Sequence, residues 1–307
     1  MTEGSISLTL DDHVYPFKVE GANVRGRLVR LGPALNSILS AHAYPDPVAR
    51  LLGDALVLTA LLGSALKFAG IFSLQLKGEG PITLIAADYK SDGAGAGELR
   101  GYIQADTDQV RDGAPFRALV GEKASFALTI DPQGDMERYQ GIVPAGETGL
   151  ADSALSYFNQ SEQIPTAVQL ATARVMGQSE GWRAGGILIQ HLPGPGLQIE
   201  TPDADAWPRA EALLNTVKMD ELTDPGLAPE DLIYRLYHED GARVFPPQPL
   251  MQGCRCSRAK IEHTLGQFPR ADIKDMVADS GLIEVTCEFC SARYDFDPAQ
   301  ITASDER

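Results

Sequence analysis

The chain has 307 residues, of which 44% are hydrophobic and 22% charged, as in ordinary soluble globular proteins. Its formal net charge is −16 and its pI about 4.7, which argues against binding to nucleic acid or anionic lipid, because both reward clustered lysine and arginine. The length predicts two domains and a core that is stable without disulfides or metal.

The N-terminal sequence has neither the basic flank nor the apolar stretch of a signal peptide. The most apolar region, residues 51–76, is interrupted by Asp54 and Lys67, and its uncharged run covers only residues 55–66. Crossing a bilayer takes about 20 apolar residues, so we predict a buried helix continuing into a strand and no membrane segment. We therefore expect a cytoplasmic protein, whose thiols are kept reduced.

Two helices are predicted first. The segment "GPALNSILSAH" carries its apolar residues on one helical face, which predicts a helix over residues 32–42. A second helix is expected from "YPDPVARLL", where Asp46 can cap the free N–H groups and Pro47 fits the first helical position. Gly70 is expected to end this helix.

The apolar pattern then changes to a period of two, which predicts strands. We expect a hairpin over residues 72–86, a strand over 99–105, a second hairpin over 123–143, a helix over 150–164 stopped by Pro165, and strands over 166–175 and 184–192. Helices mixed with hairpins predict an α+β domain with an antiparallel sheet over residues 1–194.

Residues 195–252 have a different composition, since nine of the 20 prolines lie between Pro193 and Pro249. Two short amphipathic helices are predicted within this proline-rich linker. The first has an apolar face of Trp207, Leu213, Leu214 and Val217, and the second has one of Leu232, Ile233, Leu236 and Tyr237. These faces are expected to pack on another part of the protein.

Residues 253–307 are expected to form a third, small domain. Ser257 can cap a helix over residues 258–265, and a second helix is predicted over 269–279 before Gly281. Short strands are predicted over residues 282–286 and 292–296.

Most other motifs are weak. The segment "GQSEG" (residues 177–181) matches a nucleophile elbow at Ser179, but strand-like residues on both sides predict a hairpin loop instead. The glycine-rich residues 93–101 lack the last glycine of a dinucleotide fingerprint. The five histidines are scattered, and His263 alone is kept as a candidate neighbour of a metal site.

The four cysteines all lie after residue 253, as C-x-C and C-x-x-C separated by 30 residues. Inert buried cysteines would not pair twice at such short spacings. A secreted disulfide framework conflicts with the absence of a signal peptide. A thioredoxin-like C-x-x-C should open a helix, whereas a strand is predicted after this one. The pattern therefore predicts a tetrahedral Zn²⁺ site made by Cys254, Cys256, Cys287 and Cys290.

The surroundings of this site argue against a zinc ribbon that binds nucleic acid. Residues 254–307 contain seven Lys and Arg and ten Asp and Glu, a net charge of −3. C-x-C is tighter than the usual C-x-x-C knuckle, and Arg255, Arg258 and Lys260 lie next to it. We expect these cations to stabilise thiolates, which makes sulfur reactive toward oxidants.

The chain resembles the heat-shock protein 33 family, the redox-regulated holdase chaperones of bacteria, over nearly its whole length. The resemblance is carried by "CRCSR", "CEFC", "AYPDPVARLL", "LKFAGIFSLQLKGEGP", "ERYQGIV", "SEQIPT", "AGGILIQ" and "LIYRLYHED". It implies an α+β chaperone domain, a helical linker and a C-terminal zinc-binding redox switch. It also implies an ATP-independent chaperone that is not an enzyme.

The resemblance further implies how the switch works. The four cysteines hold one zinc ion in the reduced, inactive protein. Oxidation joins Cys254 to Cys256 and Cys287 to Cys290, releases zinc and unfolds the C-terminal region and the linker. The oxidised protein, expected to be a homodimer, then holds unfolding client proteins against aggregation. Structural zinc contributes about 10–16 kcal/mol, whereas folding stability is about 5–15 kcal/mol, so its loss can unfold a small domain.

We predict that the apolar faces of the two linker helices, the eight residues named above, carry the client surface. The competing hypothesis is that the N-terminal domain binds clients and the linker masks it. A hypothesis of another class is a zinc-ribbon module, associated with nucleic acid or with an enzyme, in which zinc is purely structural.

Overall fold

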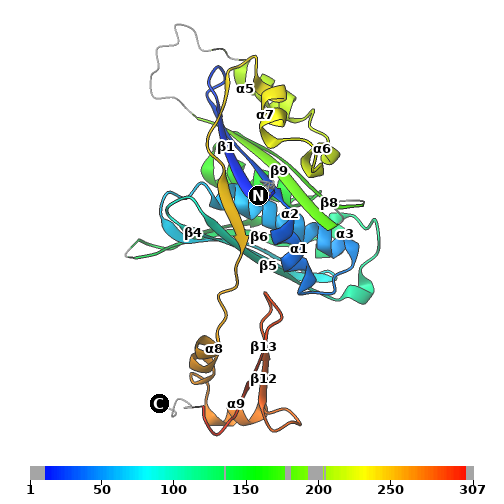
Figure 1. Cartoon of the computed structure of the whole chain (residues 1–307). Coiled ribbons are helices and arrows are strands. Elements are labelled where there is room, and N and C mark those ends of the chain that lie inside the picture. The colour runs from blue at the N-terminus through cyan, green and yellow to red at the C-terminus, as the bar shows by residue number, and fades with distance from the viewer. Residues whose placement is uncertain (1–10, 135, 177–180, 193–202, 204, 302–307) are drawn as a thin grey trace, which may run out of the picture. The chain divides into compact units, whose positions relative to one another are not determined.

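Figure 1 presents the computed structural model, which describes residues 11–134, 136–176, 181–192, 203 and 205–301. The chain divides into two compact units, an N-terminal unit of residues 1–252 and a C-terminal unit of residues 253–307. The described linker residues therefore belong to the N-terminal unit. The Ser179 motif lies outside the described residues, apart from Gly181.

The N-terminal unit is built from a large sheet and several helices. Its strands are β1 (His13–Val19), β2 (Val24–Leu31), β3 (Ala69–Lys77), β4 (Ile82–Asp92), β5 (Gly97–Ala105), β6 (Ser125–Pro132), β7 (Tyr139–Pro144), β8 (Thr166–Val175), β9 (Gly181–His191), β10 (Ala242–Val244) and β11 (Gln248–Gln252). Its α-helices are α1 (Pro33–Ser40), α2 (Asp46–Gly63), α3 (Phe116–Val120), α4 (Leu150–Tyr157), α5 (Ala206–Leu214), α6 (Met219–Thr223) and α7 (Pro229–Tyr237). A short 3₁₀ helix η1 (Thr107–Gln109) and a π-helical turn η2 (Phe158–Glu162) complete it.

The strands form one 11-stranded sheet in the order β7-β6-β3-β4-β5-β11-β1-β2-β9-β8, with β10 paired to β1. Neighbouring strands are antiparallel, as predicted, except that β11 runs parallel to β5. On its other side β11 pairs with β1, so this strand of five residues joins two half-sheets. We call β1, β2, β9 and β8 the first half-sheet, and β5, β4, β3, β6 and β7 the second.

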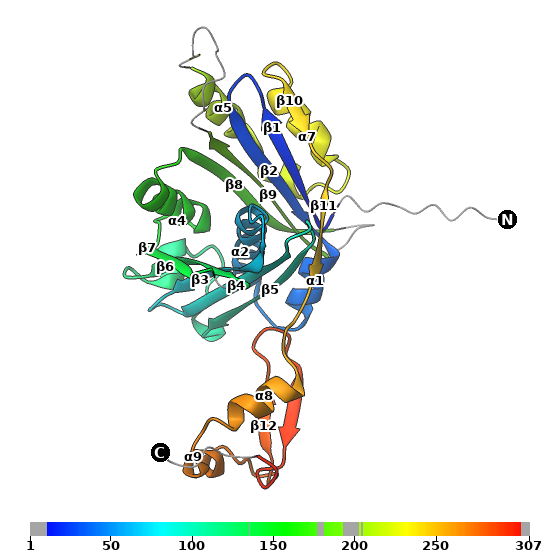
Figure 2. The same cartoon turned by 90° about the vertical axis from the view of Figure 1, so that its left-hand side faces the viewer.

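Helix α2 lies between the two half-sheets (Figure 2). Its apolar residues are buried on every side, from Val48 near its start to Leu62 near its end. Both half-sheets contribute to the same core, for example through Val29 of β2 and Leu74 of β3. The apolar stretch that the sequence places at this helix is therefore core, and the mixed α+β prediction is confirmed.

Three details of the predicted helices are wrong. The second helix ends at Gly63 and not at Gly70, because Gly70 already lies in β3, where its bare Cα lets the backbone of β6 approach. Asp46 makes no side-chain capping bond, since it is itself the first helical residue. The helix before Pro165 ends as an α-helix at Tyr157 and continues as a π-helical turn.

Four strands escaped the sequence analysis: β1, β2, β10 and β11. β1 contains a proline, Pro16, and β2 carries Arg25, Arg27 and Arg30 within eight residues, which hides the period of two. β10 and β11 are short, and their partners β1 and β5 lie far away in the sequence. Local patterns do not report such pairings.

Helices α5, α6 and α7 cover the face of the first half-sheet that is turned away from α2 (Figure 1). A second core cluster lies between these helices and the sheet, and includes Phe17 of β1, Leu28 of β2 and Ile187 of β9. The rings of Phe17 and Tyr237 stack there with their centroids 5.8 Å apart.

The C-terminal unit contains α8 (Arg258–Leu265), α9 (Arg270–Asp275), β12 (Ile283–Thr286) and β13 (Arg293–Phe296), with the strands antiparallel. Ser257 caps α8 as predicted, since its Oγ accepts the Lys260 N–H at 3.3 Å. α9 is shorter than predicted. The buried core cluster of this unit consists of Leu265, Ile273, Ile283, Phe296 and Ile301.

Within the described ranges, no helix combines the length and the hydropathy that a bilayer crossing requires.

Candidate metal centre

Two backbone turns bring the four cysteines together. Cys254 and Cys256 lie on the irregular segment that precedes α8, while Cys287 and Cys290 lie in the turn between β12 and β13. In that turn the Cys287 N–H donates to the Ala292 carbonyl at 2.9 Å, and the Ser291 N–H donates to the Cys287 carbonyl at 2.8 Å. The left-handed φ of 55° at Ser291 lets the chain reverse within this short distance.

The four sulfur atoms all lie within 4.8 Å of one another. Cys254 Sγ is 3.4 Å from Cys256 Sγ and 3.7 Å from Cys287 Sγ, and Cys256 Sγ is 3.5 Å from Cys290 Sγ. A tetrahedron with Zn–S bonds of about 2.3 Å has edges of about 3.8 Å. A disulfide needs about 2.05 Å. The cysteines are thus free thiols arranged with the size of a four-sulfur zinc site.

The thiols depend on one another for their ionisation. Burial raises the pKa of Cys290 to about 12 and also raises the pKa of Cys287. Burial acts in the same direction on Cys254, but hydrogen bonds from the Cys256 backbone N–H and from the neighbouring thiols lower its pKa to about 7. Four thiolates therefore need a cation between them, and Zn²⁺ would supply that charge.

Other groups around the sulfurs favour thiolates by hydrogen bonding. The N–H groups of Phe289 and Cys290 are directed at Cys287 and lower its pKa against the effect of burial. The Tyr294 hydroxyl lies 3.3 Å from Cys256 Sγ, and this hydrogen bond raises the pKa of Tyr294 to about 12. A protonated phenol donates to a thiolate, so Tyr294 acts as an outer partner of the site.

Two basic residues next to the first cysteine pair bind backbone carbonyls. The Arg258 Nη2 donates to the Asp295 carbonyl at 2.6 Å, and its guanidinium lies over the Phe296 ring. Lys260 Nζ donates to the Arg255 carbonyl at 3.0 Å. Arg258 and Lys260 thus fasten α8 to its surroundings, and their stabilisation of the thiolates stays a prediction. His263 is exposed and not part of the sulfur cluster.

A family model described as Hsp33 protein matches residues 12–297. The chain belongs to the Hsp33 family. It is 44% identical over 298 residues to the "33 kDa chaperonin" of Caulobacter vibrioides, covering 94% of this chain and 96% of that one. The protein of the same name from Azotobacter vinelandii is 38% identical over 291 residues, with coverages of 94% and 93%.

The fold agrees with that family. A crystal structure of the 33 kDa chaperonin (heat shock protein 33 homolog) from Thermotoga maritima matches with a TM-score of 0.77, covering 94% of this chain and 96% of that one at 21% identity. This likeness covers most of the chain, and it confirms the α+β architecture.

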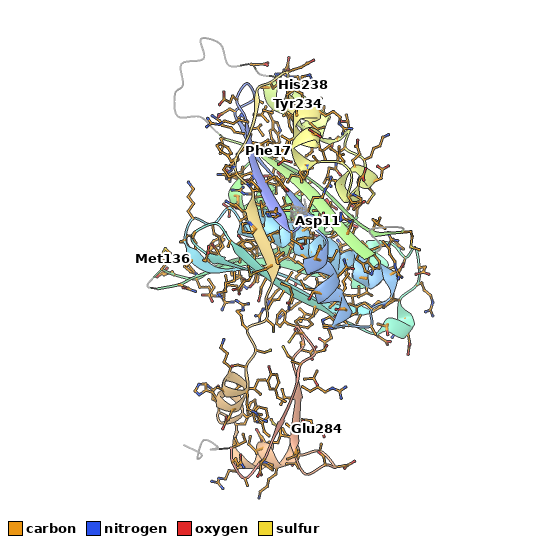
Figure 3. The ribbon with its side chains drawn as sticks, viewed as in Figure 1. Asp11, Phe17, Met136, Tyr234, His238 and Glu284 are labelled. Carbon is orange, nitrogen blue, oxygen red and sulfur yellow. The ribbon has the colours of Figure 1, made fainter. Side chains whose placement is uncertain are left out.

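In this Hsp33 family member, the residues predicted to carry the client surface are covered. Leu214, Leu232, Ile233, Leu236 and Tyr237 are buried in the second core cluster, and Trp207, Leu213 and Val217 are partly buried against it. The opposite side of α7 is open, since Tyr234 is 65% exposed and lies with His238 on the outer side of the helix (Figure 3).

Two residues that hold these helices were missed by the sequence analysis. Arg30 of β2 is 1% exposed, and its Nη atoms donate to the carbonyls of Glu221, Asp224 and Leu227. At Gly185 of β9, a Cβ atom would lie 2.1 Å from the Leu222 carbonyl oxygen, so the backbone of α6 rests directly on the strand. The Gly-Gly pair in "AGGILIQ" was the available signal for such a close approach.

We expect the reduced protein to bind one zinc ion per chain through four sulfurs. X-ray absorption at the zinc edge should give four Zn–S distances of about 2.3 Å. Cys287→Ser should abolish tight binding, whereas His263→Ala should retain full zinc, because that side chain is outside the cluster. A nitrogen ligand that disappears in the His263 variant would contradict the four-sulfur site.

Proposed function

We propose that this chain is a redox-regulated, ATP-independent holdase chaperone whose zinc centre is the sensor. The observation that carries the proposal is the placement of four clustered thiols in a unit with only a small core. Membership of a family whose curated relatives are named 33 kDa chaperonin supports the chaperone activity. In the reduced state zinc holds the C-terminal unit folded and the protein inactive.

The switch follows from the chemistry of the cluster. An oxidant takes two electrons from each pair of thiolates, which forms a disulfide and removes two zinc ligands. Zinc with two or fewer sulfurs is released, and its binding energy of about 10–16 kcal/mol is lost from folding. Five buried apolar side chains do not replace that contribution, so the unit unfolds.

Unfolding would then spread into the linker, because β11 ends at Gln252, two residues before Cys254. The apolar faces of α5 and α7 would leave the first half-sheet and hold clients through the eight residues named in the sequence analysis. The acidic linker would keep the complex soluble. The oxidised protein would act as a homodimer in the cytoplasm, without nucleic acid, membrane or catalytic chemistry.

Suppression of aggregation tests this proposal. A thermally unfolding client is mixed with reduced and with peroxide-treated protein, and zinc release is followed in parallel. We expect little suppression before oxidation and strong suppression after it, with loss of one zinc per chain. A variant with all four cysteines replaced by serine distinguishes loss of zinc from oxidation elsewhere. Equal suppression in both redox states would overturn the proposal, as would suppression that appears with zinc still bound.

We further expect oxidation to join Cys254 to Cys256 and Cys287 to Cys290. The three short sulfur separations are nearly equal, so proximity favours no pairing. Once the unit unfolds, however, closing a loop of a few residues costs less entropy than closing one of more than 30. Peptide mapping under non-reducing conditions should recover two local disulfides. A dominant link between the two motifs would refute this pairing.

A further inference from the structure

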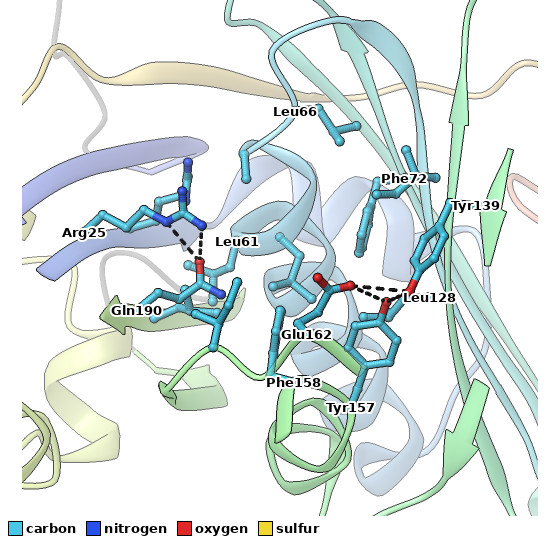
Figure 4. A pocket seen from close by; sticks show the side chains of 16 residues that line it. Arg25, Leu61, Leu66, Phe72, Leu128, Tyr139, Tyr157, Phe158, Glu162 and Gln190 are labelled. Carbon is cyan, nitrogen blue, oxygen red and sulfur yellow. Dashed lines mark hydrogen bonds between the residues drawn. The ribbon is translucent and has the colours of Figure 1, made fainter. Parts of the chain in front are cut away.

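A pocket of about 200 Å³ lies in the N-terminal unit between the two half-sheets, beyond the C-terminal end of α2 (Figure 4). Most of its wall is apolar, with Leu61 from α2, Phe72 from β3, Leu128 from β6 and Phe158 from η2. An apolar cavity of about 150 Å³ in another protein holds a benzene molecule. This pocket therefore has room for a substituted aromatic ring.

One wall of the pocket is cationic. Arg25 and Arg27 are two residues apart on β2, so both side chains leave the same face of the strand. Arg25 donates from Nε and Nη2 to Gln190 Oε1 at 3.2 and 3.0 Å. Arg27 Nε is buried without a hydrogen-bond partner among the described residues. No ion pair in that part of the chain includes either arginine.

Two guanidinium groups side by side in apolar surroundings destabilise each other. Burial and the neighbouring charge of Arg25 lower the pKa of Arg27 to about 10, so the Arg27 guanidinium is still charged at neutral pH. Both side chains are partly buried, and charges withdrawn from water normally have a counter-ion. This pair, in a chain with a net charge of −16, has none among the described residues.

The opposite wall contains a carboxylate, Glu162, which already accepts hydrogen bonds from two tyrosines. The Tyr157 hydroxyl donates to Glu162 Oε1 at 3.2 Å, and the Tyr139 hydroxyl donates to the same atom at 3.5 Å. Figure 4 shows this trio facing Arg25 and Gln190 across the apolar side chains. Tyr139 is 45% exposed, so the pocket reaches the surface beside it.

We propose that this pocket binds a small aromatic carboxylate. The ligand's carboxylate takes the place of the missing counter-ion between Arg25 and Arg27, where guanidinium groups can bind it through paired hydrogen bonds. Its ring lies among Leu61, Phe72 and Leu128. A hydroxyl group on the far side of the ring meets Glu162. An inorganic anion would leave the apolar walls uncovered, and a nucleotide exceeds the volume.

The test uses three matched probes: 3-phenylpropionate, its 4-hydroxy derivative, and the neutral 3-phenylpropionamide. Each is titrated calorimetrically into reduced, zinc-loaded, full-length protein. We expect the carboxylates to bind with a Kd of roughly 1 mM or below, as ligands of this size do in a suitable pocket. The amide should bind at least about tenfold more weakly, because it loses the charge-assisted bonds. The hydroxyl group should improve binding.

Two variants address the two parts of the pocket. Arg27→Met should weaken binding of the carboxylates by about tenfold or more, and Ala65→Leu should block the ring while both arginines remain. Arg174→Met is the matched control, since Arg174 is exposed on β8 and does not line the pocket. Circular dichroism verifies that each variant is folded.

The melting temperature distinguishes a ligand-binding arginine from a structural one. Replacing a structural arginine would lower the melting temperature, whereas replacing Arg27 should raise it. Arg27→Met removes a partly buried cation whose Nε has no hydrogen-bond partner among the described residues, so the melting temperature of the protein without ligand should rise. A fall in melting temperature with unchanged binding would overturn the proposal. Absence of carboxylate binding to the wild-type protein at a ligand concentration of about 10 mM, tenfold above the expected Kd, would also overturn the proposal.

Discussion

Removing zinc from the reduced protein is expected to unfold the C-terminal unit while the N-terminal sheet remains folded. A chelator under reducing conditions separates this effect from disulfide formation. In the zinc-free protein the amides of β12 and β13 should exchange with solvent at nearly the rate of an unstructured peptide. Amides of β3 and β4 in the large sheet should keep their protection, because their core does not include the metal site.

The expected size of this effect follows from the contents of the unit. Its buried core cluster has five members, and α8 and α9 are short. Structural zinc contributes about 10–16 kcal/mol, comparable to the whole stability of a typical domain, about 5–15 kcal/mol. Restoring zinc should restore protection. A zinc-free protein with intact protection in β12 and β13 would show that the metal does not hold the unit together.

A control variant separates zinc from ordinary stability. Ser257→Ala removes the N-cap of α8 at a cost of about 1 kcal/mol and leaves the four sulfurs in place. This variant should bind zinc and keep the strands protected. Its failure to fold would mean that the unit is marginal even with metal, and would weaken the use of zinc loss as a specific trigger.

The same experiment, extended to oxidised protein, examines the linker. Exchange across residues 205–252 should become faster on oxidation, and should slow again where a client is bound. Faster exchange without protection by the client would favour the competing hypothesis, in which the linker masks a surface of the N-terminal domain. Unchanged exchange in the linker would eliminate unfolding beyond the C-terminal unit.

The sequence was informative where function depends on local spacing. C-x-C and C-x-x-C each fit within one turn, so the cysteines alone predicted the sulfur cluster that the structure contains. The hairpins β3–β4 and β6–β7 were also predictable, because their partners are neighbours in the chain. The β1–β2 hairpin was missed, because Pro16 and the arginines of β2 hide its period of two. The joining of two half-sheets by β11 was not, since its five residues pair with strands more than 140 residues away and carry no pattern of their own.

The arginines of β2 illustrate why the pocket and the contact between sheet and linker could not be predicted from the sequence. In the sequence, Arg25, Arg27 and Arg30 suggest a solvated surface, because arginine is seldom buried. In the fold, the first two line an apolar pocket and the third is 1% exposed beneath the linker. Their roles depend on which face of the strand each side chain takes and on helices distant in sequence, information that a charge pattern does not contain.

Weakening the docking of the linker is expected to activate the reduced protein while zinc stays bound. In Gly185→Ala the new Cβ would lie 2.1 Å from the Leu222 carbonyl oxygen, closer than atoms can approach, so α6 must move off β9. In Arg30→Met the carbonyls of Glu221, Asp224 and Leu227 lose their donor. Hydrogen bonds from a charged group are worth about 1.5–3 kcal/mol each, so the docked state should lose at least about 3 kcal/mol.

A loss of that size changes the ratio of docked to released linker by more than about 100-fold. Both variants should therefore suppress client aggregation without oxidant, and their linkers should be cleaved readily by protease. Zinc content should stay at one per chain, because neither residue belongs to the C-terminal unit. Arg30→Lys should be intermediate, since one ammonium does not reproduce the fork of donors that reaches three carbonyls.

Gly226→Ala is the matched control for Gly185→Ala. It adds the same methyl group within the linker, but the nearest atom is the Asp224 carboxylate Oδ1 at 3.3 Å, a contact that a shift of a few tenths of an ångström relieves. This variant should remain inactive until it is oxidised. Activation by Gly185→Ala but not by Gly226→Ala would identify the contact between sheet and linker as the step that zinc release must overcome. The Gly185 and Arg30 variants could instead release their linkers and still be inactive until oxidation. In that case the released linker does not carry the client surface, and the C-terminal unit must do more than hold the linker in place.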